Sequence, residues 1–320
     1  MNDAANSIAT VVATHVLPPR LAVAWAAFFN FAAVFIFGTA IAKTIGGGIV
    51  APGIVDNPFV LSALVGALAW VWLCTHYGLP ISVSHSLIGG LVGAALMKGG
   101  WDAVIWWPGV GMIAIFIVLS PVIGGVLGYL LMSLSTLCSY RGSYYRMTAL
   151  FRGLQLASSA FFSLGHGSND AQKVAGLITA LLVANHHLEM GAEVPYWVLF
   201  TCYLVIGLGT LMGGWRVIRT LGVKMTKLEP IGGFSAETGG AMTLVVASHF
   251  GIPISTTHTI TGAIMGVGTT KHRLSAVRWG VAANIVIAWA TTIPACALVS
   301  ALAMRLLQTM NLPFLAGRAP

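Results

Sequence analysis

Two stretches of this sequence combine residue types that could bind an anion, and they repeat the same order of residues. Residues 78–85 read GLPISVSH, and residues 251–258 read GIPISTTH. In each stretch a proline removes a backbone N–H donor and restricts the residue before it, so a helix should end there. The serine two positions later, Ser82 or Ser255, is a residue type that caps the start of a new helix. The free N–H groups at such a helix start attract anions.

Hydroxyl side chains follow both predicted breaks and add hydrogen-bond donors. They are Ser84, Ser86, Thr256, Thr257 and Thr259. A proline kink in which serine and threonine bond back to their own helix would explain one such stretch. Two copies with the same residues at matching positions favour the anion site.

A second repeated pair carries carboxylates. Asn2-Asp3 near the start matches Asn169-Asp170 in the second half of the chain. Carboxylate and amide oxygens are hard ligands that suit a small cation such as Na⁺, and an intramembrane carboxylate can also carry a proton. We therefore predict that Asn2, Asp3, Asn169 and Asp170 bind a small cation or a proton, with Asp3 and Asp170 as the ligands if the cation is Na⁺.

Asp170 lies about halfway along the apolar segment 153–183. A charge in the middle of a bilayer costs about 2.5–3.5 kcal/mol, so acids there are candidates for function. An ion pair with Lys173, one helical turn away, would explain Asp170 on its own. It would not explain the repeat, because the position that matches Lys173 in the first copy is Asn6. We therefore favour a functional role for both Asp3 and Asp170.

Glu237 and three histidines are further candidates. Glu237, in FSAETGG, is predicted to begin the helix that leads into the second break. The position that matches it in the first half is Leu64, so any role of Glu237 is not duplicated. His85, His166 and His258 could donate to an anion, relay a proton or pair with a carbonyl group. We favour a structural role for all three histidines.

The composition places these residues in a membrane protein. Of the 320 residues, 57% are hydrophobic and 8% are charged, whereas soluble domains carry about 25% charged residues. A stretch of about 20 apolar residues is long enough to cross a bilayer. The longest stretches without Asp, Glu, Lys or Arg are Leu21–Ala42, Asn57–Met97, Ala103–Tyr140, Val194–Trp215, Thr238–Thr270 and Trp279–Met304. The sequence therefore predicts an all-α polytopic membrane protein.

Basic residues cluster in short loops between these stretches. Three loops carry them: 141–152, 216–227 and 271–278. Because positively charged loops stay in the cytoplasm, we place these loops inside and the acidic loop 184–195 outside. The net charge of +8 then reflects membrane topology, and we expect no nucleic acid partner.

The repeats extend to a third match, since Lys43–Gly46 resembles Arg219–Gly222. Three matches in the same order indicate an internal duplication. The loop charges place the two copies in opposite directions across the membrane, and such inverted-topology repeats are typical of secondary transporters. We predict a first repeat at 1–132, a basic cytoplasmic linker at 133–152 and a second repeat at 153–320. Each repeat should contain one proline-broken re-entrant hairpin, and we expect the first helix to lack its leading half.

Taken together, the motifs resemble those of the PiT family of inorganic phosphate transporters. They are NDAANSIAT near the start, SLGHGSNDAQK at 163–173, GLPISVSH, GIPISTTH, and WRVIRTLG at 215–222. The resemblance implies a bacterial low-affinity permease of the cytoplasmic membrane that imports phosphate by symport with Na⁺ or H⁺ and holds no cofactor. It also implies that Ser82, Ser84, Ser255 and Thr257 line the phosphate site, and we add the neighbouring Thr256. By the same resemblance, the coupling group for the cation or proton consists of Asn2, Asp3, Asn169, Asp170 and Glu237.

Several alternatives remain open at this point. The family resemblance also allows transport of sulfate, or of phosphate complexed with a divalent metal and coupled to protons. An intramembrane hydrolase could use the serines and histidines with Asp170, but an enzyme needs one site, and here the groups are duplicated. A channel would not need a central binding site formed by broken helices with mutually neutralising charges. We expect no enzyme activity, inorganic phosphate and the lipid bilayer as partners, and leave a homodimer open.

Overall fold

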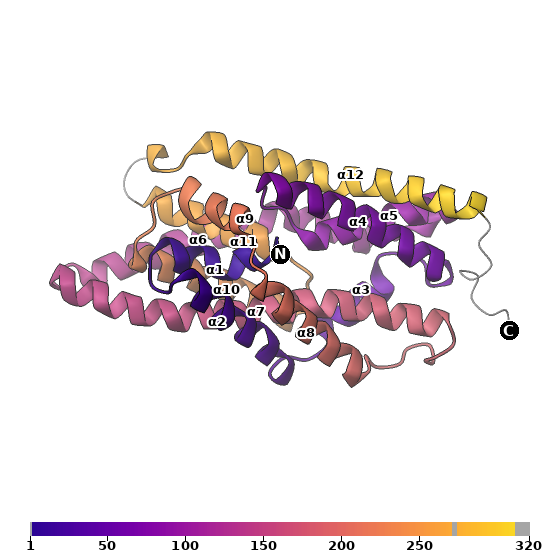
Figure 1. Ribbon diagram of the computed structural model, residues 1–320, viewed down its shortest axis with the longest axis horizontal. Helices are drawn as coiled ribbons and strands as arrows, with labels where there is room; N and C mark the ends of the chain where they lie inside the picture. The colour runs from indigo at the N-terminus through magenta and orange to yellow at the C-terminus, as the bar shows by residue number, and fades with distance from the viewer. Residues whose placement is uncertain (1, 271–273, 311–320) are drawn as a thin grey trace.

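The computed structural model describes residues 2–270 and 274–310, and in this part of the chain the regular structure is helical (Figure 1). A single isolated bridge joins Val50 and Val104. The α-helices are α1 (Ala4–Ala13), α2 (Pro19–Ala32), α3 (Ala40–Gly48), α4 (Asn57–Tyr77), α5 (Val83–Gly99), α6 (Gly111–Ser139), α7 (Tyr144–Ala184), α8 (Tyr196–Leu211), α9 (Trp215–Arg219), α10 (Pro230–His249), α11 (Thr256–Thr269) and α12 (Trp279–Met310).

Several of these helices are long and apolar enough to cross a membrane. Three qualify as single helices, namely Asn57–Tyr77, Trp106–Ser139 and Trp279–Met310. Two more spans are possible as bent pairs, because α2 and α3 meet at 84° and α8 and α9 meet at 67°. The outer face of α6 exposes large apolar side chains, including Val118, Val122 and Leu130, as a lipid-facing helix should. The chain is a multi-pass membrane protein, as the composition predicted.

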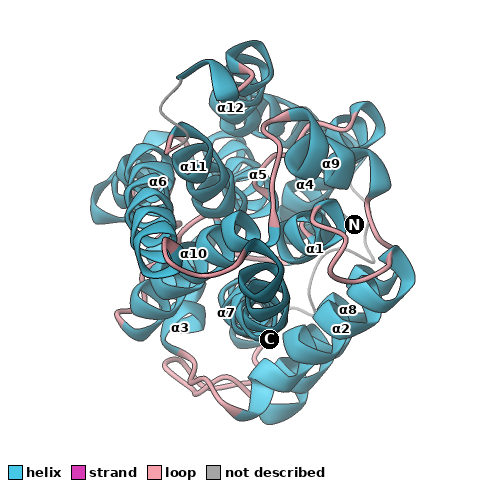
Figure 2. Cartoon of the chain, turned by 90° about the vertical axis from the view of Figure 1, so that its left-hand side faces the viewer, coloured by secondary structure: helices cyan, strands magenta, loops and turns pink. Residues whose placement is uncertain are grey.

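The polar helices lie inside this apolar shell. Viewed along the long axis, α1, α5 and α10 lie near the middle, while α6, α12, α2 and α8 lie around them (Figure 2). Helix α7 has 41 residues and is therefore about 60 Å long, roughly twice the thickness of the hydrocarbon core. Its first turns, which carry Arg146 and Arg152, must extend beyond the bilayer.

The two predicted hairpins are present. Helices α4 and α5 form one, and α10 and α11 form the other. In Figure 1, α4 and α5 extend from the middle toward the right, whereas α10 and α11 extend toward the left. Their tips meet in the middle, where the Thr257 hydroxyl donates to the Ile81 carbonyl at 3.1 Å and the rings of His85 and His258 are 4.8 Å apart.

The serine caps of each break are as the sequence predicted, whereas the preceding helix ends at a glycine before the proline is reached. Helix α4 ends at Gly78 with φ of 71°, and α10 ends just before Gly251 with φ of 67°. This left-handed conformation favours glycine, which has no Cβ to clash. The Ser82 Oγ then accepts the His85 backbone N–H at 3.2 Å, and the Ser255 Oγ accepts the His258 N–H at 3.2 Å. Both serines are therefore N-caps, as expected.

Each half of the chain holds the hairpin of the other half. The Thr220 hydroxyl donates to the Gly78 carbonyl at 2.8 Å, and the Thr44 hydroxyl donates to the Gly251 carbonyl at 2.9 Å. These threonines belong to the third repeated stretch. The repeated residues thus make equivalent contacts that cross between the halves, which confirms the predicted fold class. The boundaries proposed for the repeats and the linker stay a prediction, and residues 311–320 of the second repeat lie outside the described residues.

Candidate functional site

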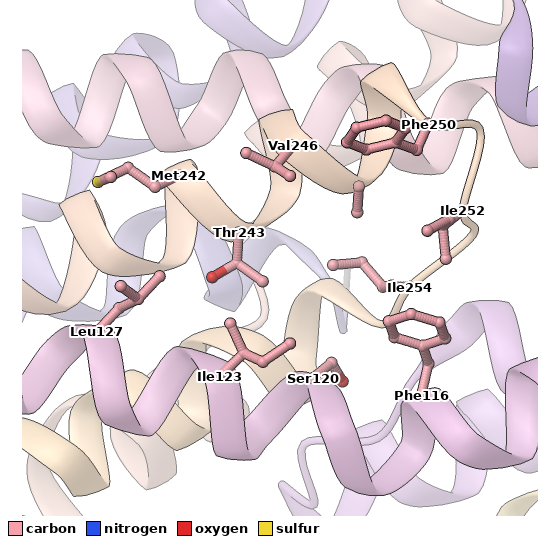
Figure 3. A pocket seen from close by; sticks show the side chains of 11 residues that line it. Phe116, Ser120, Ile123, Leu127, Met242, Thr243, Val246, Phe250, Ile252 and Ile254 are labelled. Carbon is pink, nitrogen blue, oxygen red and sulfur yellow. The ribbon is translucent and has the colours of Figure 1, made fainter.

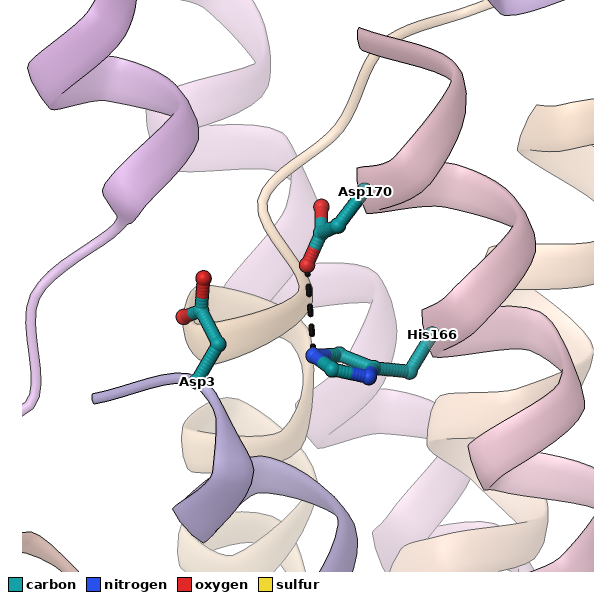
Figure 4. A group of neighbouring side chains, drawn as sticks. All are labelled: Asp3, His166 and Asp170. Atoms are coloured by element: carbon teal, nitrogen blue, oxygen red, sulfur yellow. Dashed lines mark ion pairs between the residues drawn. The ribbon is translucent and has the colours of Figure 1, made fainter. Parts of the chain in front are cut away.

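Two carboxylates lie where the hairpin tips meet α1 and α7. Asp3 precedes α1, and Asp170 lies within α7. One oxygen of each carboxylate and one ring nitrogen of His166 all lie within 4.8 Å of one another (Figure 4). The predicted pair of aspartates is therefore assembled into one cluster, and this cluster could hold a cation.

Asp170 is almost fully surrounded by donors. Its Oδ1 accepts the Lys173 ammonium at 2.8 Å and the Ser84 hydroxyl at 3.3 Å. Its Oδ2 accepts the Thr256 hydroxyl at 3.0 Å and lies 3.3 Å from the His166 Nε2. The ion pair that was considered as an alternative explanation of Asp170 is present, but it lies inside the cluster.

Asp3 has neutral partners. The Thr257 hydroxyl and the Asn6 amide nitrogen each lie 3.1 Å from its Oδ1 and can donate to it. The Asn6 amide nitrogen is also 2.9 Å from the Thr257 hydroxyl. Within the residues that the structure describes, Asp3 has no ion pair at salt-bridge distance. Of the two carboxylates, Asp3 is therefore the one without a bonded cation among the residues that the structure describes.

The two predicted asparagines contact the hairpins. The Asn2 amide nitrogen donates to the Thr75 hydroxyl at 3.0 Å and to the Leu79 carbonyl at 3.1 Å. The Asn169 amide nitrogen donates to the Ser248 hydroxyl at 3.4 Å. Both amides thus bind the last turn before a hairpin break. Their predicted role as cation ligands stays a prediction, and their contacts show a positioning role that the motif did not reveal.

The five predicted phosphate ligands fall into two groups. Ser82 and Ser255 use their hydroxyls as helix caps. Ser84, Thr256 and Thr257 direct theirs toward Asp170 or Asp3. The starts of α5 and α11 therefore converge on the carboxylates with their positive dipole ends and first-turn N–H groups. The binding of phosphate by these five residues stays a prediction.

Glu237 lies in a separate buried pocket of neutral donors. Its side chain is 1% exposed. Its Oε1 accepts the Thr10 hydroxyl at 2.6 Å and the Gln155 amide at 3.1 Å, and its Oε2 accepts the Ser158 hydroxyl at 2.5 Å. Thr10 lies seven residues after Asp3 on α1, which corresponds to about 10 Å along a helix. Glu237 is therefore near the aspartate cluster but distinct from it.

Several residues that contact the carboxylates were not among the predicted site residues. Lys173 and His166 contact Asp170, Asn6 contacts Asp3, and Gln155 contacts Glu237. The repeat itself contained a signal for Asn6 and Lys173, because they match each other in the two copies. For Gln155 the sequence offered no signal.

The other two histidines pack near the hairpin tips. The His258 ring stacks on Trp289 with centroids 3.8 Å apart, and its Nδ1 lies 3.3 Å from the Ile117 carbonyl. The His85 ring meets the His258 ring edge to face. These contacts agree with the structural role favoured for both.

A cavity of about 210 Å³ between α6 and α10 is separate from the polar cluster (Figure 3). Its lining is apolar apart from two hydroxyl groups and consists of Phe116, Ser120, Ile123, Leu127, Met242, Thr243, Val246, Ala247, Phe250, Ile252 and Ile254. An oxyanion would lose its hydration there and gain at most two hydroxyl donors. This cavity is therefore not the phosphate site.

A second cavity, of about 290 Å³, borders the cluster more closely. It lies between the bend that joins α2 to α3, the α7 residues Ser168 and Gln172, and the end of α10 at Ser248. Ser248 accepts a hydrogen bond from Asn169, the neighbour of Asp170. This more polar cavity therefore lies beside the segment of α7 that carries Asp170.

A multi-pass helical protein with two broken hairpins around a buried polar centre has the architecture of a secondary transporter. Comparison with known proteins identifies the family. The model of the phosphate transporter family matches residues 1–149 and 140–300. The chain belongs to this family, whose transported substrate is phosphate.

The relatives agree with this assignment. The chain is 53% identical to a probable low-affinity inorganic phosphate transporter of Rhizobium meliloti, over 94% of this chain and 90% of that protein. It is 41% identical to a protein of the same description from Bacillus subtilis, with the same coverage. A solved structure titled as the sodium-dependent phosphate transporter is similar with a TM-score of 0.87 and 28% identity, covering 97% of this chain and 95% of that one. The family and these relatives are transporters, so the hydrolase alternative is dropped.

Proposed function

We propose that this protein imports inorganic phosphate into the bacterial cytoplasm by symport with a cation, either Na⁺ or H⁺. The observation that carries the proposal is the convergence of two helix starts and two carboxylates at the hairpin tips. Helix starts and hydroxyls attract the oxyanion, and the carboxylates attract the cation. Family membership supports phosphate as the substrate.

The charges of the cluster give a physical reason for coupling. When both are ionised, Asp3 and Asp170 carry two negative charges, and the Lys173 ammonium at 2.8 Å from Asp170 offsets one of them. A phosphate anion placed about 4 Å from the remaining carboxylate would be repelled by about 4 kcal/mol at an effective dielectric constant of 20. A bound Na⁺ or proton at Asp3 removes this repulsion, so phosphate and cation favour each other's binding.

Transport then requires that the empty and the fully loaded site change sides while the half-loaded site does not. The two hairpins come from opposite ends of the molecule (Figure 1), so movement of one against the other would open the centre to one side at a time. Glu237, with neutral donors around it, would offer a second position for the coupling cation. The hydroxyls of Ser84, Thr256 and Thr257 would turn from the carboxylates to the phosphate oxygens.

Uptake of radiolabelled phosphate into proteoliposomes tests this proposal. A symporter accumulates label above the outside concentration only when a Na⁺ or pH gradient is imposed, whereas a channel equilibrates it. The two gradients applied separately identify the coupling ion. Uptake with added Mg²⁺ tests transport of a metal–phosphate complex, and an excess of sulfate tests the sulfate alternative. Equilibration without accumulation under either gradient would refute coupled transport.

A further inference from the structure

The two halves of the central cluster are built from matching residues. One half contains Asp3, Asn6, the Thr257 hydroxyl and the Ile81 carbonyl, joined by contacts of 2.9–3.1 Å. The other half contains Asp170, Lys173, the Ser84 hydroxyl and the Ile254 carbonyl, joined by contacts of 2.7–3.3 Å. Each member occupies the same place in its copy of the repeated motifs.

Among these matched members, the two halves differ in charge at one position; His166 also lies beside Asp170, with its Nε2 3.3 Å from the Asp170 Oδ2. Where the first half has the neutral amide of Asn6, the second half has the ammonium of Lys173. That ammonium lies 2.8 Å from the Asp170 carboxylate, 2.8 Å from the Ser84 hydroxyl and 2.7 Å from the Ile254 carbonyl. A carboxylate, a hydroxyl and a backbone carbonyl are oxygen ligands that a small hard cation prefers.

All hydrogen-bonding capacity of the ammonium is used inside the protein. Lysine has three N–H donors and no acceptor, and three oxygens of the chain receive them. The Lys173 side chain is also buried, with 2% of its surface exposed. No N–H of Lys173 therefore points toward a phosphate anion unless a bond to the protein is broken.

We infer that Lys173 acts as a tethered cation, which permanently occupies the position at Asp170 that a mobile cation would otherwise take. Only the Asp3 half then binds an exchangeable cation from this pair. The inference rests on the proposed cation-coupled uptake and defines its stoichiometry at the central cluster. Because the Lys173 ammonium cannot diffuse away, it keeps Asp170 neutralised throughout the transport cycle. No transported cation is then needed at Asp170.

The substitution Lys173→Asn tests this inference, because it gives the second half the same residue as the first. The variant should bind one additional Na⁺ or proton. Purified protein without phosphate should gain about 2–4 °C in its unfolding midpoint when Na⁺ rises to about ten times its dissociation constant, beyond any gain of the wild type. If a proton is the added ion, the midpoint should instead depend more steeply on pH than in the wild type.

Two further variants sharpen the test. Lys98→Asn is the matched control, because Lys98 also contacts a carboxylate and a carbonyl, Asp56 at 2.5 Å and Ile54 at 2.7 Å, but outside the cluster. It should leave the dependence on Na⁺ and pH unchanged. Asn6→Lys should have the opposite effect to Lys173→Asn, since it places an ammonium in both halves, and phosphate uptake should lose its dependence on a cation at this pair.

The outcomes separate this inference from the proposed function. An unchanged dependence of Lys173→Asn on both Na⁺ and pH would overturn the tethered cation. It would also be overturned if Lys173→Asn lost stabilisation by inorganic phosphate while Lys173→Arg kept it, since Lys173 would then be a phosphate ligand. Wild-type protein without gradient-driven uptake would refute the proposed function, whereas the cation-dependent unfolding of Lys173→Asn can be measured without transport.

Discussion

The contact between Asp170 and Lys173 allows a quantitative prediction. At 2.8 Å and an effective dielectric constant of about 20, the attraction between the two charges is about 6 kcal/mol. The substitution Asp170→Asn removes this attraction and leaves the ammonium buried against neutral oxygens. Removing one partner of a buried pair costs about 3–5 kcal/mol, so the unfolding midpoint in detergent should fall by roughly 10 °C.

The variant should nevertheless insert and fold. The hairpin breaks are also held from outside the cluster, by the Trp289 indole at the Pro80 carbonyl (3.0 Å) and by Thr44 and Thr220 at the glycine carbonyls. Coupled phosphate uptake in proteoliposomes should be abolished, because Asp170 no longer balances the charge beside it.

The double variant Asp170→Asn/Lys173→Asn isolates the interaction. Because it removes both charges, its stability should be restored to within about 1–2 kcal/mol of the wild type, although uptake stays impaired. As a control, Asp56→Asn breaks the pair with Lys98, whose side chains are 43% and 23% exposed, and should cost at most about 1 kcal/mol. Losses of Asp170→Asn and Lys173→Asn that simply add in the double variant, or full uptake by Asp170→Asn, would refute the reasoning.

Three other predictions concern the hairpins and the polar groups near them. Thr44→Val and Thr220→Val each remove one hydrogen bond to a hairpin glycine, and each should lower the unfolding free energy by about 1 kcal/mol in a thermal or denaturant titration. The two losses should add in the double variant. Strongly unequal losses from the two single variants would contradict the equivalence of the halves. Thr257→Val should weaken phosphate binding roughly tenfold in a competition assay because it removes the hydroxyl beside Asp3, while Thr259→Val, whose hydroxyl bonds back to its own helix, should bind normally. Glu237→Gln should keep the fold but reduce gradient-driven uptake roughly tenfold, and unchanged uptake would remove Glu237 from the coupling group.

The hairpins could be predicted from sequence because their causes are local. Each helix ends at a glycine, and Pro80 or Pro253 follows two residues later, where it cannot continue the helix. Ser82 and Ser255 then begin the next helix within a few residues. Because the same residues occur in both halves of the chain, a functional break was favoured over a simple proline kink. The contacts of the third repeated stretch, Lys43–Gly46 and Arg219–Gly222, could not be predicted. Thr44 donates a hydrogen bond to a glycine far away in the chain, and no local pattern indicates such a contact.

The sequence predicted which acidic residues belong to the site but not which contacts they make. Asp3 and Asp170 were found from the repeat, and the structure brings them together. Lys173 was weighed only as a partner of Asp170 on the same helix, since the sequence could not show that Ser84 and the Ile254 carbonyl complete its surroundings. An ion pair and a functional site were treated as alternatives, whereas the geometry places the ion pair within the site.

The surroundings of Glu237 show a further limit of sequence reasoning. Its partners Thr10, Gln155 and Ser158 come from α1 and α7 and are distant from it in the chain. Threonine and serine are frequent in apolar helices, where they bond to the preceding turn, so these residues carried no signal. Only the burial of a carboxylate in the structure reveals that they form its hydrogen-bonding shell.

One face of α1 connects the two acidic sites. Asp3, Asn6, Thr10 and Thr14 follow each other at intervals of three or four residues, so their side chains share that face. The first two contact the central cluster, Thr10 contacts Glu237, and the Thr14 hydroxyl donates to Gln155 at 2.9 Å.

This polar face indicates on which side of the central cluster Glu237 lies. The Arg152 guanidinium donates to the His15 carbonyl at 2.7 Å, so α1 ends beside the basic loop for which the positive-inside rule predicts a cytoplasmic location. A cation that leaves Asp3 toward that side would meet Glu237 next. The first half has Leu64 at the matching position, so the repeat does not provide a counterpart of Glu237 toward the other side. We therefore expect Glu237→Gln to slow release of the cation into the cell more than its binding from outside, so that exchange of phosphate across the membrane is impaired less than net uptake.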